Sequence, residues 1–224
     1  MATEAPSPTA IVGSLLGTAV ADALGLPYEG LSRRRGRRIY GEPDRHRLLF
    51  GRGMVSDDTE HACMVAQSLI AAGSDADRFA RRLAHHLRWW LLSLPAGTGL
   101  ATLKATAKLC LGFSPQRSGV FSAGNGPAMR SPILGAAIAD LVELKQFVRT
   151  STRITHTDPK AEIGAWAVAL AARHSSEGDA DAASFVGHLH RTLEDDPAAE
   201  FLALVDRVAR RIAAGESTEE FAAA

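Results

Sequence analysis

The sequence predicts an all-α fold, and two observations lead to this prediction. Almost every apolar stretch places its hydrophobic residues three or four positions apart, which is the spacing of one helix face, and no stretch shows the alternation of a half-buried strand. With 224 residues, 46% of them hydrophobic and 22% charged, the chain is long enough to bury a substantial core. We therefore expect residues 1–224 to form one compact helical bundle with its functional residues on the loops between helices.

Composition narrows the classes of function. The 25 basic and 25 acidic residues cancel, which argues against a global attraction to nucleic acid or to a membrane surface. Cys63 and Cys110 lie in apolar helical segments, so we predict buried, reduced thiols and a cytoplasmic location. We also expect a monomer. The apolar run at 11–24 follows no positive residue and is shorter than the roughly 20 residues of a membrane span, so we expect neither a secretory signal nor a span.

The first predicted helix covers 11–24 and ends at Gly25. Gly13, Gly17 and Ala21 form a stripe of small residues along it, which predicts the close approach of another helix. The turn that follows carries one carboxylate, Glu29. After it, residues 33–38 contain five arginines in six positions, a run that favours a solvated, mobile basic loop over a phosphate-binding patch.

Residues 56–59 read Ser-Asp-Asp-Thr and stand at the start of a second apolar-periodic segment. Backbone N–H groups at a helix start are unpaired, and the helix dipole favours negative charge there. Helix capping is the commoner explanation of such residues, and Asp57 with Glu60 has the spacing of a capping box. A hard-cation site is the alternative, since two carboxylates and a hydroxyl suit Mg²⁺, Mn²⁺ or Ca²⁺. The helix that follows is predicted to bury Ala62, Val65, Ala66, Leu69 and Ile70.

Six further helices follow along the chain. We predict them at 77–92, 101–111, after Ser131-Pro132, after Asp158-Pro159, and as a pair at 182–193 and 197–213. The first of these should bury Phe79, Leu83, Leu87 and Trp90. Between the second and third, Asn125 is flanked by Gly124 and Gly126, which suits a tight turn with positive φ whose N–H groups could hold a phosphate. The same glycines are also common in ordinary loops.

Taken in order, these motifs resemble those of the ADP-ribosylglycohydrolase family over about residues 11–172. The set is Gly17-Thr-Ala-Val-Ala-Asp-Ala-Leu-Gly25, Glu29, Ser56-Asp-Asp-Thr59, Pro95-x-Gly-x-Gly99, Gly124-Asn-Gly-Pro-Ala-Met-Arg130 and Thr155-His-Thr-Asp-Pro159. The resemblance implies an all-α fold with a binuclear Mg²⁺ or Mn²⁺ centre. It implies hydrolysis of the glycosidic bond between ADP-ribose and an acceptor, on an ADP-ribosylated protein or a small ADP-ribosyl conjugate.

The resemblance also implies roles for individual residues. Ser56, Asp57 and Asp58 match the family's first metal-binding group, and Glu29 matches a glutamate that serves as metal ligand or as acid/base. Glu29 and Asp57 are therefore the catalytic candidates. The residues that match the ADP-ribose pocket, or lie close to it, are Gly124, Asn125, Gly126, Met129, His156 and Asp158. Two cations could fix the ribose hydroxyls and polarise water while a carboxylate moves a proton, in a reaction with an oxocarbenium-like transition state.

Members of the family also carry a late Gly-Asp-x-Asp-Thr motif that completes the metal centre. Residues 178–182 read Gly-Asp-Ala-Asp-Ala, and we interpret them as a linker. We therefore expect the chain to lack the family's C-terminal portion, so that the second half of the metal site is missing. Two alternative functions stay open on this ground: a catalytically inactive module that binds ADP-ribose or another protein, and a helical protein without a ligand.

Overall fold

The computed structural model describes residues 7–95, 98–178, 181–194 and 197–223. Within them every regular element is a helix, and the one bridge of strand type, Val120 with His156, is isolated. The helices are α1 (Pro8–Gly25), α2 (Arg33–Tyr40), α3 (Asp57–Ala72), α4 (Ala76–Leu92), α5 (Leu100–Cys110), α6 (Pro115–Ser118), α7 (Gly126–Met129), α8 (Pro132–Ala137), α9 (Leu141–Thr155), α10 (Pro159–Ser176), α11 (Ala182–Thr192), α12 (Ala199–Ala213) and α13 (Thr218–Ala223), with short 3₁₀ turns η1 (Leu26–Tyr28) and η2 (Leu49–Gly51). The predicted all-α fold is confirmed.

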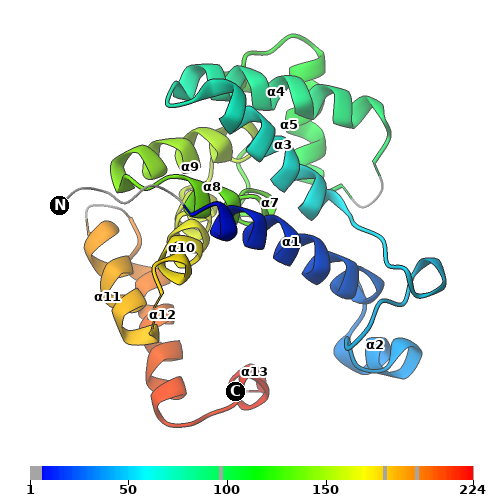
Figure 1. The fold of residues 1–224 in the computed structure, drawn as a ribbon, viewed down its shortest axis with the longest axis vertical. Coiled ribbons are helices and arrows are strands. Elements are labelled where there is room, and N and C mark those ends of the chain that lie inside the picture. The colour runs from blue at the N-terminus through cyan, green and yellow to red at the C-terminus, as the bar shows by residue number, and fades with distance from the viewer. Residues whose placement is uncertain (1–6, 96–97, 179–180, 195–196, 224) are drawn as a thin grey trace.

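The hydrophobic core lies among α3, α4, α8, α9 and α10 (Figure 1). The predicted inward face of α4 is confirmed, since Phe79, Leu83 and Leu87 are fully buried, and the Phe79 ring lies 5.1 Å from that of Phe147 on α9. Helices α8 and α10 pack most closely, because Gly135 leaves room for the backbone carbonyl of Ala169. The helices of this core are joined by the loops that line the cleft described below.

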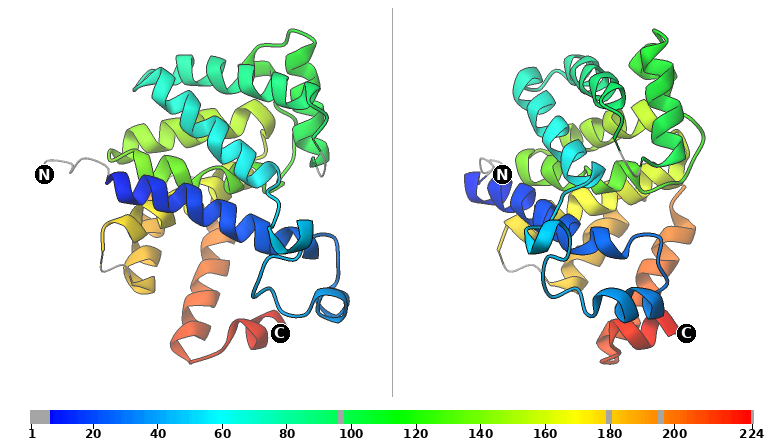
Figure 2. Two further views of the ribbon diagram at one scale, coloured as in Figure 1. Left: turned by 45° about the vertical axis from the view of Figure 1, so that its right-hand side comes forward. Right: turned by 90° about the vertical axis from the view of Figure 1, so that its right-hand side faces the viewer.

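Helix α1 crosses one side of this core, as both views in Figure 2 show. The predicted close helix contact is wrong, because a Cβ at Gly13 or Gly17 would meet no atom within 4 Å. The helix contacts the core through Ile11 and Leu15, and Asp22 and Ala23 are buried near its C-terminal end. The segment Pro8–Tyr28 spans 21 residues with a mean hydropathy of 1.6, so our length argument against a membrane span is wrong. Length and composition alone would allow one, although core helices and signal sequences pass the same test.

Three further predictions about the first part of the chain are wrong. The arginine run forms helix α2, whose start is capped by Ser32, and not a loop. Cys63 and Cys110 are exposed, because each lies on the outward face of its helix. Ile70 is 85% exposed, since only part of the α3 apolar stripe reaches the core.

Candidate active-site cleft

The start of α3 is held by a carboxylate from α1. The buried side chain of Asp22 accepts hydrogen bonds from the backbone N–H and the hydroxyl of Ser56, both at 2.8 Å. It also accepts from the backbone N–H of Thr59 at 3.2 Å and from the Thr59 hydroxyl at 2.5 Å. Asp22 therefore satisfies unpaired N–H groups that every helix start presents. The sequence analysis assigned no role to this residue.

The capping-box interpretation is wrong. Ser56 is the N-cap, and its hydroxyl accepts from the backbone N–H of Asp58 at 3.4 Å. Glu60 points elsewhere and accepts a hydrogen bond of 2.6 Å from the indole of Trp90 on α4. Because capping falls to Ser56 and Asp22, the carboxylates of Asp57 and Asp58 are left to face solvent at the helix start.

These two carboxylates line a cleft of about 330 Å³ together with a third, Glu29. Glu29 comes from the turn after η1, and the opposite wall is built from α5, the loop before α7, and the residue that follows α9. The full lining is Glu29, Asp57, Asp58, Gly99, Leu100, Ala101, Thr102, Ser122, Gly124, Asn125, Gly126, Met129 and His156. The cleft thus gathers most of the residues that the sequence analysis singled out.

Two of those residues lie elsewhere. Ser56 does not line the cleft, and its hydroxyl proton goes to Asp22. Asp158 caps helix α10, where it accepts from the backbone N–H of Lys160 at 2.9 Å, and it does not line the cleft either. In the stretch interpreted as a linker, Asp181 caps α11, and residues 179–180 lie outside the described residues.

The three acidic residues of the cleft repel one another. Burial, followed by the negative charge of Asp58, raises the pKa of Asp57 to about 6. Burial also raises the pKa of Asp58, followed by the charge of Asp22, and raises that of Glu29, followed by the charge of Asp58. None of the three forms an ion pair within the described part of the chain. The cleft therefore concentrates negative charge that no cation balances through an ion pair in the described ranges.

The same three carboxylates do not converge on one point. Among the described residues, no group of three or more histidine, cysteine, aspartate or glutamate side chains is arranged to hold a metal ion. The three carboxylates are close enough to raise one another's pKa values, yet they are not arranged around one point. Both observations are explained if the carboxylates lie side by side along the border of the cleft. We conclude that the described residues form an acidic wall rather than a complete metal site.

The glycine loop on the opposite wall differs from the prediction. Neither Gly124 nor Gly126 has positive φ, and Asn125 has a helical φ of −76°. The glycines are needed for a different reason. A Cβ at Gly124 would lie 3.1 Å from His156 Nε2, and one at Gly126 would lie 3.0 Å from His156 Cε1. The absence of side chains at these two positions therefore lets the imidazole approach the loop closely.

The His156 ring is held from behind by a buried arginine. Arg130 is fully buried, and it donates to the Ser151 hydroxyl at 3.0 Å, the Ser151 carbonyl at 2.7 Å and the Thr155 hydroxyl at 2.7 Å. The Thr155 hydroxyl lies 2.9 Å from His156 Nδ1 and 3.4 Å from the Thr152 carbonyl. We assign its proton to the nearer acceptor, which places the His156 proton on Nε2, the atom beside Gly124.

This arrangement keeps His156 neutral. Burial, followed by the positive charge of Arg130, lowers the pKa of His156 to about 4. The same two causes lower the pKa of His61, whose Nδ1 lies 3.4 Å from Arg130 and whose ring meets that of Trp90 edge to face at 4.4 Å. The cleft therefore pairs an acidic wall with a neutral N–H donor.

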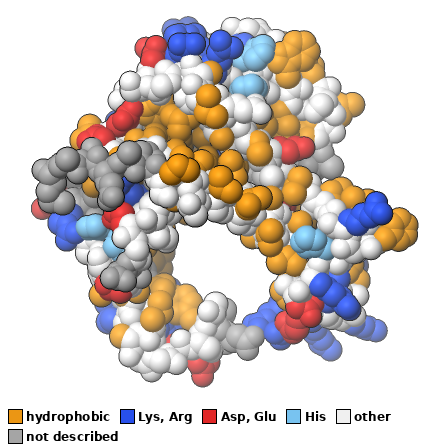
Figure 3. All heavy atoms as spheres, viewed as in Figure 1, with side chains coloured by type: hydrophobic (Ala, Val, Ile, Leu, Met, Phe, Trp, Pro, Cys, Tyr) orange, Lys and Arg blue, Asp and Glu red, His pale blue; other side chains and the backbone are white. Residues whose placement is uncertain are grey.

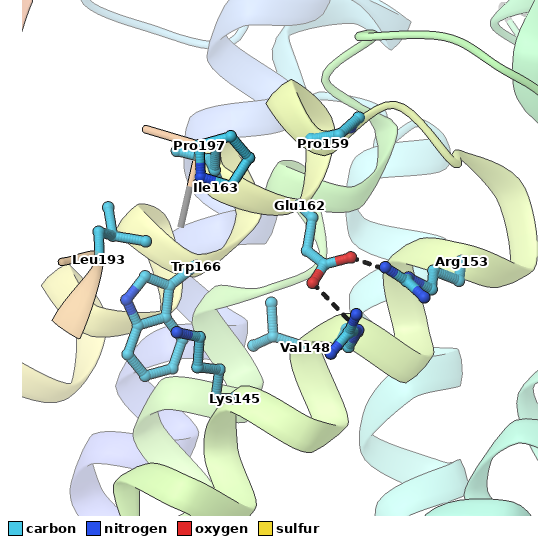
Figure 4. A pocket seen from close by; sticks show the side chains of 10 residues that line it. Lys145, Val148, Arg153, Pro159, Glu162, Ile163, Trp166, Leu193 and Pro197 are labelled. Atoms are coloured by element: carbon cyan, nitrogen blue, oxygen red, sulfur yellow. Dashed lines mark hydrogen bonds and ion pairs between the residues drawn. The ribbon is translucent and has the colours of Figure 1, made fainter. Parts of the chain in front are cut away.

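A second cavity lies between α9 and α10 (Figure 4). There Glu162 is already neutralised, because Arg153 lies 2.9 Å and Arg149 3.3 Å from its carboxylate oxygens. None of the residues that the sequence analysis placed in a site lines this cavity. The one carboxylate of this cavity is therefore paired, and the cavity lacks the unpaired carboxylates of the cleft.

The fold and the cleft together define an all-α protein with a carboxylate-lined ligand site. Residues 5–224 match the ADP-ribosylglycohydrolase family, and the chain belongs to it. The resemblance inferred from the ordered motifs is thereby confirmed.

Several relatives support this assignment. The chain is 38% identical over 164 residues to an uncharacterized protein of Archaeoglobus fulgidus, covering 70% of this chain and 52% of that protein. It is 30% identical over 221 residues to ADP-ribosylhydrolase ARH3 of Gallus gallus, covering 85% and 56%. It is 29% identical over 205 residues to the ADP-ribosyl-[dinitrogen reductase] glycohydrolase of Rhodospirillum rubrum, covering 83% and 66%.

A solved structure, an ADP-ribosylglycohydrolase-related protein complex, superimposes with a TM-score of 0.60 at 25% identity, covering 88% of this chain and 66% of that one. The chain thus spans about half to two thirds of the length of the relatives it matches.

Proposed function

We propose that the cleft binds ADP-ribosyl groups and hydrolyses the glycosidic bond that joins ADP-ribose to an acceptor, on a protein side chain or a small conjugate. The observation that carries this proposal is the meeting of an acidic wall, Asp57, Asp58 and Glu29, with the loop at Gly124 and the His156 imidazole in one cleft. Family membership supports the reaction class. The cytoplasmic location and the monomeric state stay predictions.

Asp57 is suited to move the proton that hydrolysis requires. In this reaction a water oxygen bonds to the anomeric carbon, the bond to the acceptor breaks, and the water proton is passed to the leaving group. A carboxylate with a pKa of about 6 can take and return a proton near neutral pH. Glu29, on the same cleft, is the alternative acid or base, since burial raises its pKa as well.

The opposite wall is suited to hold the ADP-ribose. His156 is neutral and presents Nε2–H, so it can donate a hydrogen bond to a substrate oxygen at any pH above its own titration. The ring packs closely against Gly124 and Gly126, and His156 lines the cleft although it is only 2% exposed. We infer that this donor and the loop N–H groups orient the substrate while the acidic wall handles the proton.

The donor set also fits a divalent cation in part. Asp57, Asp58 and Glu29 offer the carboxylate oxygens that Mg²⁺ and Mn²⁺ prefer, and their mutual repulsion would be relieved by positive charge. We propose that this acidic wall attracts such a cation, and that further ligands would be needed to complete its coordination. A bound cation would polarise water and fix sugar hydroxyls.

The test is release of free ADP-ribose from an ADP-ribosylated arginine or serine peptide, with and without Mn²⁺. We expect release by the chain and a loss of about 100-fold or more for Asp57→Asn, which is the usual contribution of a positioned acid or base. Asp140→Asn is the matched control, because this exposed carboxylate only caps α9 and should leave the rate unchanged. Release that is equal in both variants would refute the assignment.

A second function is favoured by one observation. Because the described residues contain no group able to cage a metal ion, the chain could bind ADP-ribose without cleaving it. Calorimetry with ADP-ribose separates the two functions. Binding that needs no Mn²⁺, with no peptide turnover, supports the inactive binding module, whereas Mn²⁺-dependent binding with turnover supports the hydrolase.

A further inference from the structure

The outer face of α4 carries a continuous row of basic side chains. Its members are Arg78, Arg81, Arg82, His85 and Arg88, which we call the α4 stripe. Their spacing of three or four residues places them on one side of the helix, while Phe79, Leu83 and Leu87 occupy the buried side. Figure 3 shows basic and histidine side chains together over α4, at the top of the view. The protein has no net charge, so this face is a local concentration.

The α4 stripe borders a groove rather than a flat surface. Its five residues, with Ala84 and with Pro115 of α6, line a depression of about 620 Å³. Arg88 is held in place, since its Nε donates to the carbonyl of Leu109 on α5 at 2.8 Å. The cations of the groove are therefore supported by the neighbouring helices.

The positive charge of the stripe is not balanced within the fold. No carboxylate forms an ion pair with these arginines in the part of the chain that the structure describes. The acidic residues nearest in sequence are Asp75 and Asp77, and Asp75 accepts from the Arg78 backbone N–H as the cap of α4. Elsewhere arginines do pair, as Arg153 does with Glu162 at 2.9 Å. The groove is thus suited to an anion that comes from outside.

An exposed aromatic ring stands at the end of the stripe. Trp89 is 63% exposed, and the His85 ring lies 6.3 Å from it, edge to face. Placing an indole in water has no benefit for folding, whereas an indole beside arginines is a usual device for stacking an unpaired base. An acidic peptide would engage the cations but would leave this ring without a purpose.

We propose that the α4 groove binds single-stranded nucleic acid, with its phosphodiester backbone along the α4 stripe and a base stacked on Trp89. Arginine favours phosphate, because its planar guanidinium can donate two parallel hydrogen bonds. A duplex fits less well, since its bases are already stacked. The proposal is independent of hydrolysis in the cleft, because it concerns binding alone.

The test is fluorescence anisotropy of a labelled oligothymidylate titrated with the whole chain at several salt concentrations. We expect binding that weakens steeply with salt, and a loss of tenfold or more for the double variant Arg81→Ala/Arg82→Ala. The slope of log K against log salt should also fall in magnitude by about 1.4, since each phosphate contact to a single strand contributes about 0.7. Trp89→Ala should weaken binding at least about fivefold without changing the slope.

The control is Arg34→Ala/Arg38→Ala on α2, which removes the same charge from another exposed face. We expect less than a twofold change in affinity. An equal loss in the two double variants would overturn the proposal, because net charge alone would then explain binding. Absence of binding at low salt, tighter binding of polyglutamate than of the oligonucleotide, or equal binding of single strand and duplex would overturn it too.

Discussion

Replacing Asp22 by alanine should cost more stability than the loss of an ordinary helix cap. The carboxylate accepts two backbone N–H and two hydroxyl hydrogen bonds from Ser56 and Thr59, at 2.5 to 3.2 Å. Hydrogen bonds to a charged group contribute about 1.5–3 kcal/mol each, but the four share one partner and do not add independently. We expect a loss of about 4 kcal/mol, because four partly buried donors at the start of α3 lose their common acceptor.

Urea and thermal unfolding measure this loss. For a chain of this size about 1 kcal/mol lowers Tm by 2–4 °C, so Asp22→Ala should lower Tm by about 8–16 °C. Asp140→Ala is the matched control, because this carboxylate also bonds a helix N–H but is exposed and makes one such bond, at 2.8 Å. It should cost only about 1 kcal/mol. Equal losses in the two variants would show that Asp22 is an ordinary cap and that its position beneath the cleft has no special weight.

Three other outcomes are expected. Between pH 4 and 6.5 His156 binds a proton in the unfolded chain but not in the folded protein, so the free energy of unfolding should rise with pH in this range. The variant His156→Gln should reduce this slope by up to about 1.36 kcal/mol per pH unit. An unchanged slope, measured by urea titration at several pH values, would contradict the neutral state of the folded His156. Gly135→Ala should lower Tm, because the new Cβ would collide with the backbone of Ala169. Gly164→Ala is the control and should raise the free energy of unfolding by about 0.5–1 kcal/mol, because a Cβ there meets no atom within 4 Å. An unchanged Tm for Gly135→Ala would refute this packing. Cys63 and Cys110 should react with a thiol reagent in the native protein as fast as in urea, and protection of either would contradict their exposure.

Most of the fold could be predicted from local pattern. Asp158-Pro159 signals the start of α10, and the Phe79 face of α4 repeats at helical spacing, so neither needs a distant residue to be recognised. Helix α2 could not be predicted in this way. Its arginines show no apolar period, and its helical form depends on the Ser32 cap and on the ring of Tyr28, which packs against Gly36.

Some residues of the candidate site could likewise be identified from the sequence, and others could not. The order of motifs along the chain was sufficient to single out Asp57, Asp58, Glu29 and His156, because each stands at a position that matches the family's motif set. Asp22 escaped notice because its partner Ser56 is 34 residues away, and a single acid in an apolar helix carries no local signal beyond its interruption of the run.

By itself, the sequence determined where most of the helices form, which face α4 buries and which family the chain belongs to, because helical periodicity, caps and motif order act over a few residues. Only the tertiary structure decided what the polar residues do. In the folded protein the Ser56 hydroxyl donates to Asp22, and Gly124 and Gly126 leave room for the imidazole of His156. The burial of Arg130 behind His156 depends on several helices that meet only after folding. These are long-range contacts, and hydrogen-bond partners and local dielectric are properties of the assembled core.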